Sequence, residues 1–114
     1  MTSTMKIENR IWIEKDGFPF VGNGRVTLLE YIHETGSMSK AAKKLGMSYK
    51  KAWELVQSMN KQSNKDLVIK STGGKNGGGT LLTETGHQVV KQFRVLEEKS
   101  KNYLCAEFEN CCFN

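Results

Sequence analysis

The sequence has few cysteines, and all of them lie at one end. Only three occur among 114 residues, at Cys105, Cys111 and Cys112. An odd, clustered set in a chain without an apparent export signal argues against a disulfide framework. No Cys-x-x-Cys pair is present, and the only histidines are His33 and His87. We therefore expect free, reduced thiols and no metal site, with a thiol or metal sensor built on the cysteines as an alternative.

Long apolar runs are also lacking. No stretch approaches the roughly 20 apolar residues that a membrane helix needs, and the first residues do not form the apolar core of a signal peptide. We therefore expect a cytoplasmic protein with no membrane partner. A chain of 114 residues fits one domain, 1–114, that buries roughly two-thirds of its unfolded surface.

The residue types needed for catalysis are not gathered anywhere in the sequence. No nucleophile, base or metal set stands together, and the carboxylates are scattered among other charges. The glycine-rich segment around Lys75 does not match the phosphate-binding loop motif, because Asn76 follows Lys75 where Ser or Thr is required and no helix follows directly. We therefore expect neither an enzyme nor a cofactor.

Charge is abundant but unevenly distributed. The net charge is +5, yet the segment from Lys40 to Lys75 holds nine lysines against only Glu54 and Asp66 and so carries +7. The remainder of the chain sums to −2. A basic centre with slightly acidic flanks indicates a surface for a polyanion, although a solvated lysine-rich face would have the same composition.

The N-terminal region predicts a β-hairpin. Residues 7–14 are rich in β-branched and aromatic side chains, and Asp16-Gly17 suits a tight type I′ turn. Residues 18–21 then form a short returning strand, in which Pro19 lacks a donor and marks a sheet edge.

Helical spacing, capping residues and glycine breaks predict the remaining elements. A first helix spans 25–35, a second runs from Lys40 to Leu45 with Ser37 or Ser39 as its cap, and a third, capped by Ser48, runs from Tyr49 to about Met59. Strands at 67–71 and 80–82 enclose a segment with five glycines in eight residues, and Thr83 caps a long helix through at least Tyr103.

This order predicts an α+β, mostly helical fold. A short helix, a turn at Gly46 and a capped second helix form a helix-turn-helix, and the following hairpin acts as a wing. We divide the chain into an N-terminal hairpin (1–22), the helix-turn-helix with its wing (23–82), and a C-terminal helix with a cysteine-containing tail (83–114).

The winged helix-turn-helix order predicts contacts with double-stranded DNA. The start of the third helix faces the major groove, where lysines and hydroxyls reach bases and phosphates, and the wing approaches the backbone or minor groove. Ser48 is expected mainly to cap its helix, and Trp53 to wedge partly into the domain. The candidate DNA-binding residues are Ser37, Ser39, Lys40, Ser48, Tyr49, Lys50, Lys51, Lys70, Thr72, Lys75 and Asn76.

The long C-terminal helix predicts a homodimer. Val89, Phe93, Leu96 and Tyr103 form one apolar stripe and are the candidate dimerisation residues. Alternatively, the stripe folds back on the N-terminal hairpin of its own chain, or is divided between both contacts. The same amphipathic helix also leaves open a different function, as a protein-interaction module.

Several motifs resemble those of a known family. The blocks 36–42, 47–53 and 72–79, together with Met59-Asn60, Leu67-Val68 and 82–86, resemble the N-terminal domain of the molybdate-responsive (ModE-type) transcriptional regulators, and more loosely the LysR-type winged helices. The resemblance covers about 7–104 and implies a dimeric regulator with its third helix in the major groove and a wing that touches DNA. The sequence shows no molybdate-binding module, so no molybdate site is expected in it.

Overall fold

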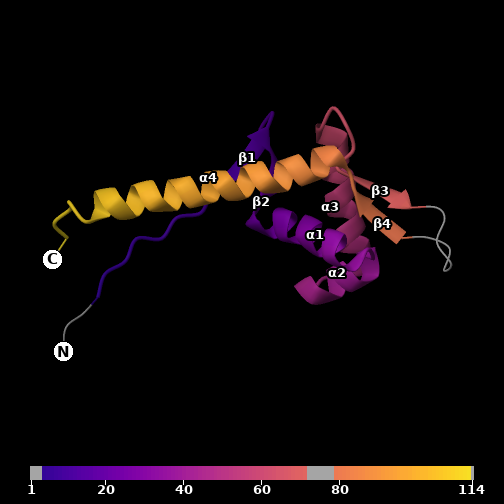
Figure 1. The fold of residues 1–114 in the computed structure, drawn as a ribbon, viewed down its shortest axis with the longest axis horizontal. Coiled ribbons are helices and arrows are strands. Elements are labelled where there is room, and N and C mark those ends of the chain that lie inside the picture. Colours follow the sequence, from indigo (N-terminus) through magenta and orange to yellow (C-terminus); the bar gives the residue numbers. More distant parts are fainter. Residues whose placement is uncertain (1–3, 72–78, 114) are drawn as a thin grey trace.

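The structure, a computed structural model, describes residues 4–71 and 79–113 (Figure 1). Two antiparallel hairpins and four helices alternate along the chain. In order they are β1 (Trp12–Lys15), β2 (Phe18–Gly22), α1 (Asn23–Thr35), α2 (Met38–Leu45), α3 (Tyr49–Gln62), β3 (Val68–Ser71), β4 (Gly79–Leu82) and α4 (Glu84–Phe108).

The N-terminal hairpin forms as predicted but is shorter. Asp16 and Gly17 turn the chain with φ angles of 53° and 83°, the left-handed pair that a type I′ turn requires. The first strand begins at Trp12, so the predicted strand 7–14 is too long at its start. The preceding residues run beside α4 instead, where Asn9 Nδ2 donates to Ser100 Oγ at 2.8 Å.

Side-chain caps set the starts of three helices. Ser37 Oγ accepts from the Lys40 amide, so Ser37 rather than Ser39 caps α2. Ser48 caps α3 by accepting from the Lys51 amide, and Thr83 caps α4. These bonds satisfy amides that have no partner within the helix.

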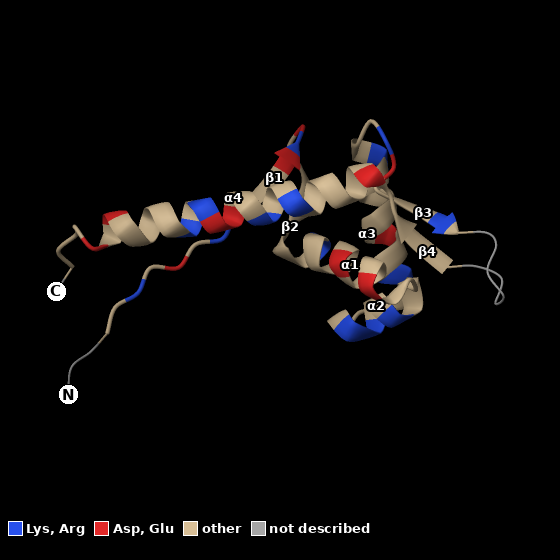
Figure 2. Ribbon diagram, viewed as in Figure 1, with Lys and Arg blue, Asp and Glu red and all other residues tan. Residues whose placement is uncertain are grey.

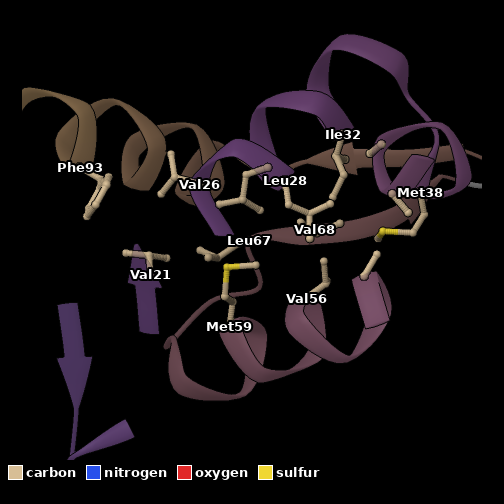
Figure 3. Close-up of a cluster of buried hydrophobic side chains, with 14 residues drawn as sticks. Val21, Val26, Leu28, Ile32, Met38, Val56, Met59, Leu67, Val68 and Phe93 are labelled. Atoms are coloured by element: carbon tan, nitrogen blue, oxygen red, sulfur yellow. The ribbon is translucent and has the colours of Figure 1, made fainter. Parts of the chain in front are cut away.

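The core lies between α1, α3 and the start of β3 (Figure 3). Apolar side chains that α1 presents at helical spacing meet those of the two following helices, and the small alanines of α2 and α3 allow close approach. The buried apolar residues are Val21, Val26, Leu28, Leu29, Ile32, Met38, Ala41, Ala42, Ala52, Val56, Met59, Leu67, Val68 and Phe93.

Hydrogen bonds at two places orient the second hairpin, β3–β4. Asn60 at the end of α3 accepts from the Leu67 amide at 2.8 Å and donates to the Val68 carbonyl at 3.0 Å. On the other strand, the Thr80 amide donates to the Gly36 carbonyl at 3.0 Å. The hairpin is therefore held both to α3 and to the end of α1.

The apolar stripe of α4 is divided. Phe93 is 1% exposed and packs into the core of its own chain, and Val89 packs partly against the same core. Leu96 and Tyr103 are 49% and 66% exposed. The expectation that all four face a second copy needs correction for Phe93, because this side chain packs into the core of its own chain.

Arg94 also joins α4 to α1. Its guanidinium makes a two-pronged contact with Glu30, at 2.7 and 3.2 Å, and donates to Asn23, Thr27 and Glu97. Hydrogen bonding to Glu30 is the main cause that raises the pKa of Arg94 above its usual value.

The three helices α1–α3 followed by the β3–β4 hairpin form a winged helix-turn-helix, which confirms the predicted fold class.

Candidate nucleic-acid interface

Among the described residues, those of the first turn of α3 are exposed. Gly46, in a left-handed conformation with φ of 68°, ends α2 and turns the chain toward Ser48. Tyr49, Lys50 and Lys51 follow the cap and are all exposed, Tyr49 by 54%. Helix-start amides that have no partner within the helix, together with the two lysine ammonium groups, favour an anionic partner.

The described lysines of the predicted DNA-binding set have no acidic partner among the described residues. Within residues 4–71 and 79–113, ion pairs involve Lys6, Lys44 and Arg94, and none involves a lysine of the predicted DNA-binding set. Figure 2 shows basic residues along α2 and near the free end of β3. Since unpaired lysines remain available to phosphate groups, this distribution suits a DNA surface.

The structure places the other predicted residues as follows. Ser39 and Lys40 are exposed on α2, and Ser37 is half-buried as its cap. Lys70 is exposed on β3. Thr72, Lys75 and Asn76 lie outside the described residues.

Lys44 differs from the neighbouring lysines in its contacts, a difference that was not predicted. Its ammonium pairs with Glu34 and lies 4.9 Å from the centre of the Tyr31 ring. Hydrogen bonding to Glu34 raises the pKa of Lys44. Lys43, which the sequence analysis did not single out, is exposed on the same helix and has no such partner among the described residues.

One cluster was not foreseen. Tyr49 and Trp53 meet edge to face, with ring centres 6.3 Å apart, and the Lys70 ammonium lies 5.0 Å from the centre of the Trp53 ring. The spacing of Tyr49 and Trp53, one helical turn, could have indicated the aromatic pair. The Lys70 contact could not be read from sequence, because it joins α3 to β3.

Histidines and cysteines form no evident metal site. His33 and His87 come together, with ring centres 4.6 Å apart, a pairing that was not predicted. The three cysteines are exposed and free. Across the part of the chain that the structure describes, no three His, Cys, Asp or Glu residues are grouped as metal ligands.

No described helix is long and apolar enough to span a membrane.

A helix-turn-helix with an exposed, capped second helix and an adjoining hairpin defines the class of winged-helix regulators. The chain belongs to the lysR family of bacterial regulatory helix-turn-helix proteins, which matches residues 25–87. That match spans α1 to the first turn of α4 and therefore includes the whole candidate interface.

Relatives of the chain include two proteins named ModE. The chain is 38% identical over 104 residues to the "Molybdenum transport protein ModE" of Azotobacter vinelandii, covering 91% of this chain and 38% of that protein. It is 36% identical over 95 residues to the "DNA-binding transcriptional dual regulator ModE" of Escherichia coli K12, covering 83% and 33%. The chain therefore spans little more than a third of the length of these relatives.

A solved structure shares the fold. The transcription regulator MepR of Staphylococcus aureus aligns with a TM-score of 0.61 at 16% identity, covering 76% of this chain and 65% of MepR. The crystal structure of a MepR–DNA complex aligns with a TM-score of 0.55 at 16% identity, over 75% and 63%. These matches support the winged-helix fold predicted from sequence.

Proposed function

We propose that this chain is the sequence-specific DNA-binding part of a cytoplasmic transcriptional regulator. In this mechanism α3 enters the major groove, and the wing contacts the backbone or minor groove. Bound protein then blocks or recruits polymerase by occupancy, which requires no catalytic step and no cofactor. The observation that carries the proposal is the exposed start of α3, where Lys50 and Lys51 have no acidic partner within the described residues.

The exposed residues divide into two roles. Tyr49 and Lys50, at the start of α3, are proposed to reach base edges, where lysine suits guanine O6 and N7. Lys40, Lys51 and Lys70, with Lys75 of the wing, are proposed to neutralise phosphates. The remaining candidates are proposed to add hydrogen bonds to the DNA backbone; they are Ser37, Ser39, Ser48, Thr72 and Asn76.

We further propose that the chain acts as a homodimer through the exposed part of α4. The name of the Azotobacter vinelandii relative concerns molybdenum transport, but this chain covers only 38% of that protein. We propose no molybdate site for it.

Salt dependence tests DNA binding directly. A pool of random duplexes first identifies a bound sequence, and fluorescence anisotropy then measures affinity against salt concentration. Neutralising about six phosphates should give a log–log slope near −5. A slope near zero would remove DNA as the main partner.

Single substitutions test the two roles. Lys50→Ala should weaken specific binding by roughly 1–3 kcal/mol and relax sequence preference, if its contact is to a base. Lys61→Ala, at the opposite end of the same helix, is the matched control and should change little. Equal losses on specific and random duplexes for both Lys50→Ala and Tyr49→Ala would show that α3 does not read sequence.

A further inference from the structure

Trp53 occupies the corner between α3 and the wing. Its indole packs partly against the core, meets the Tyr49 ring edge to face, and has the Lys70 ammonium over its ring. Tyr49 belongs to the first turn of α3, and Lys70 stands near the end of β3, opposite Thr80. One side chain therefore contacts both elements that the proposed function sets against DNA.

Lys70 is held by a ring face rather than by a carboxylate. The distance of 5.0 Å from its ammonium to the Trp53 ring centre is within cation–π range, and tryptophan offers the most favourable ring. Among the described residues, no ion pair involves Lys70. An ion pair would compete with phosphate, whereas a ring face orients the ammonium and leaves most of its hydrogen-bonding protons free.

We infer that Trp53 is a positioning residue, which holds the Lys70 ammonium beside the start of α3, where it contacts the phosphate backbone between the grooves that α3 and the wing enter. This inference rests on the proposed function. A helix in the major groove and an adjoining wing on the next groove are separated by one sugar–phosphate strand, and the corner that Trp53 occupies faces it. A lysine already held in place loses less rotamer freedom on binding, so its contact with phosphate is stronger.

Removing the ring should weaken DNA binding through Lys70. Trp53→Leu should lower affinity by roughly 2- to 5-fold on specific and random duplexes alike, the range expected for an exposed cation–π contact. Trp53→Phe keeps a ring face and should retain more affinity than the Leu variant. Anisotropy at fixed salt measures both, with circular dichroism to confirm folding.

A double-mutant cycle separates positioning from a merely structural role. In a Lys70→Met background, Trp53→Leu should cost almost nothing more, because the ammonium it positions is gone. In a Lys61→Met background, the matched control on the far end of α3, Trp53→Leu should cost its full 2- to 5-fold. Should Trp53→Leu fail to fold, Trp53→Met replaces it, since methionine fills irregular space.

The outcomes are distinct. A wild-type chain whose binding shows no salt dependence defeats the proposed function itself. If the wild type binds as proposed, an equal loss from Trp53→Leu with and without Lys70 overturns the positioning role. Phe and Leu variants that bind equally weakly overturn it as well, because the ring face then has no effect.

Discussion

Ser48 is proposed to have two roles at the start of α3, and they can be separated. Its Oγ accepts from the Lys51 amide at 3.0 Å, which is the helix cap, and the residue is exposed next to the proposed reading residues. Serine and aspartate are equally good caps, but only aspartate adds a negative charge.

Substitutions at Ser48 should therefore move stability and DNA binding independently. Ser48→Ala should lower the free energy of unfolding by about 1 kcal/mol, because the Lys51 amide loses its partner. Ser48→Asp should leave stability unchanged or raise it, yet weaken DNA binding roughly tenfold or more through repulsion of phosphate. Urea denaturation and anisotropy measure the two effects. Normal DNA binding by Ser48→Asp would place this end of α3 away from the duplex.

Gly86 is a glycine required by close packing. A Cβ there would run into the Leu67 carbonyl oxygen and lie 2.8 Å from Leu82 Cδ1, where α4 begins against the wing strands. The Leu67 carbonyl belongs to the backbone and cannot turn aside as a side-chain end can, so the backbone must shift. By contrast, a Cβ on Gly24 in α1 would meet nothing within 4 Å.

The two helical glycines should thus respond in opposite directions to the same change. Gly86→Ala should destabilise the fold by about 2–3 kcal/mol through overpacking. Gly24→Ala should be neutral or stabilise by up to about 1 kcal/mol, because alanine favours the helix. Chemical denaturation of both variants is the measurement, and equal stabilities would contradict the close approach at Gly86.

At the scale of elements, local signals predicted local structure well. Asp16-Gly17 has the one backbone conformation that a two-residue hairpin needs, and the capping residues Ser48 and Thr83 begin their helices where predicted. These signals act within a few residues, so they are visible in sequence. The first strand was predicted too long because a strand needs a paired partner as well as β-forming residues. The partner strand β2 ends at Gly22, and α1 follows it directly.

Contacts between distant elements were not predictable. Periodicity showed that Phe93 and Leu96 share a broad face of α4, but it could not show how far α1 extends beneath that face. Phe93 lies over α1 and is buried, whereas Leu96 is half-exposed. The pairing of His33 with His87 and of Trp53 with Lys70 likewise depends on how helices and wing pack.

Arg94 tests how firmly α4 is joined to α1. The planar fork of arginine matches the Glu30 carboxylate and still reaches Asn23 and Thr27, and a lysine cannot make these contacts together. Arg94→Lys should therefore lower the free energy of unfolding by about 1–2 kcal/mol, an amount reduced because the side chain is partly exposed.

The control for Arg94→Lys is Glu8→Gln. Lys6 and Glu8 form an ion pair whose side chains are 80% and 73% exposed, so breaking it should change stability little. Thermal denaturation of both variants measures the difference. An Arg94→Lys variant as stable as wild type would mean that apolar packing around Phe93 alone holds α4 in place.

At the scale of the whole molecule, α4 extends far beyond the helices it covers (Figure 1). It spans 25 residues, about 37 Å at 1.5 Å per residue, in a molecule whose longest dimension is 59 Å. Its exposed apolar residues, Val95, Leu96 and Tyr103, lie at and beyond the level where Phe93 docks. A second copy that covers these residues would remove apolar area from water and pair two recognition helices.

Leu96→Glu should yield a folded monomer, since Leu96 lies outside the core. Lys101→Glu also makes α4 more negative, about 140° around the helix from Leu96 and away from Val95, and should leave the dimer intact. The paired recognition helices should bind half-sites about 34–36 Å apart, or a multiple of that distance, on a roughly palindromic operator. Loss of the dimer should weaken operator binding by roughly 100-fold, because the second half-site is then bound independently. Sedimentation equilibrium and anisotropy measure both effects. A wild-type chain that is monomeric at micromolar concentration, and binds a palindrome without cooperativity, would contradict dimerisation through α4.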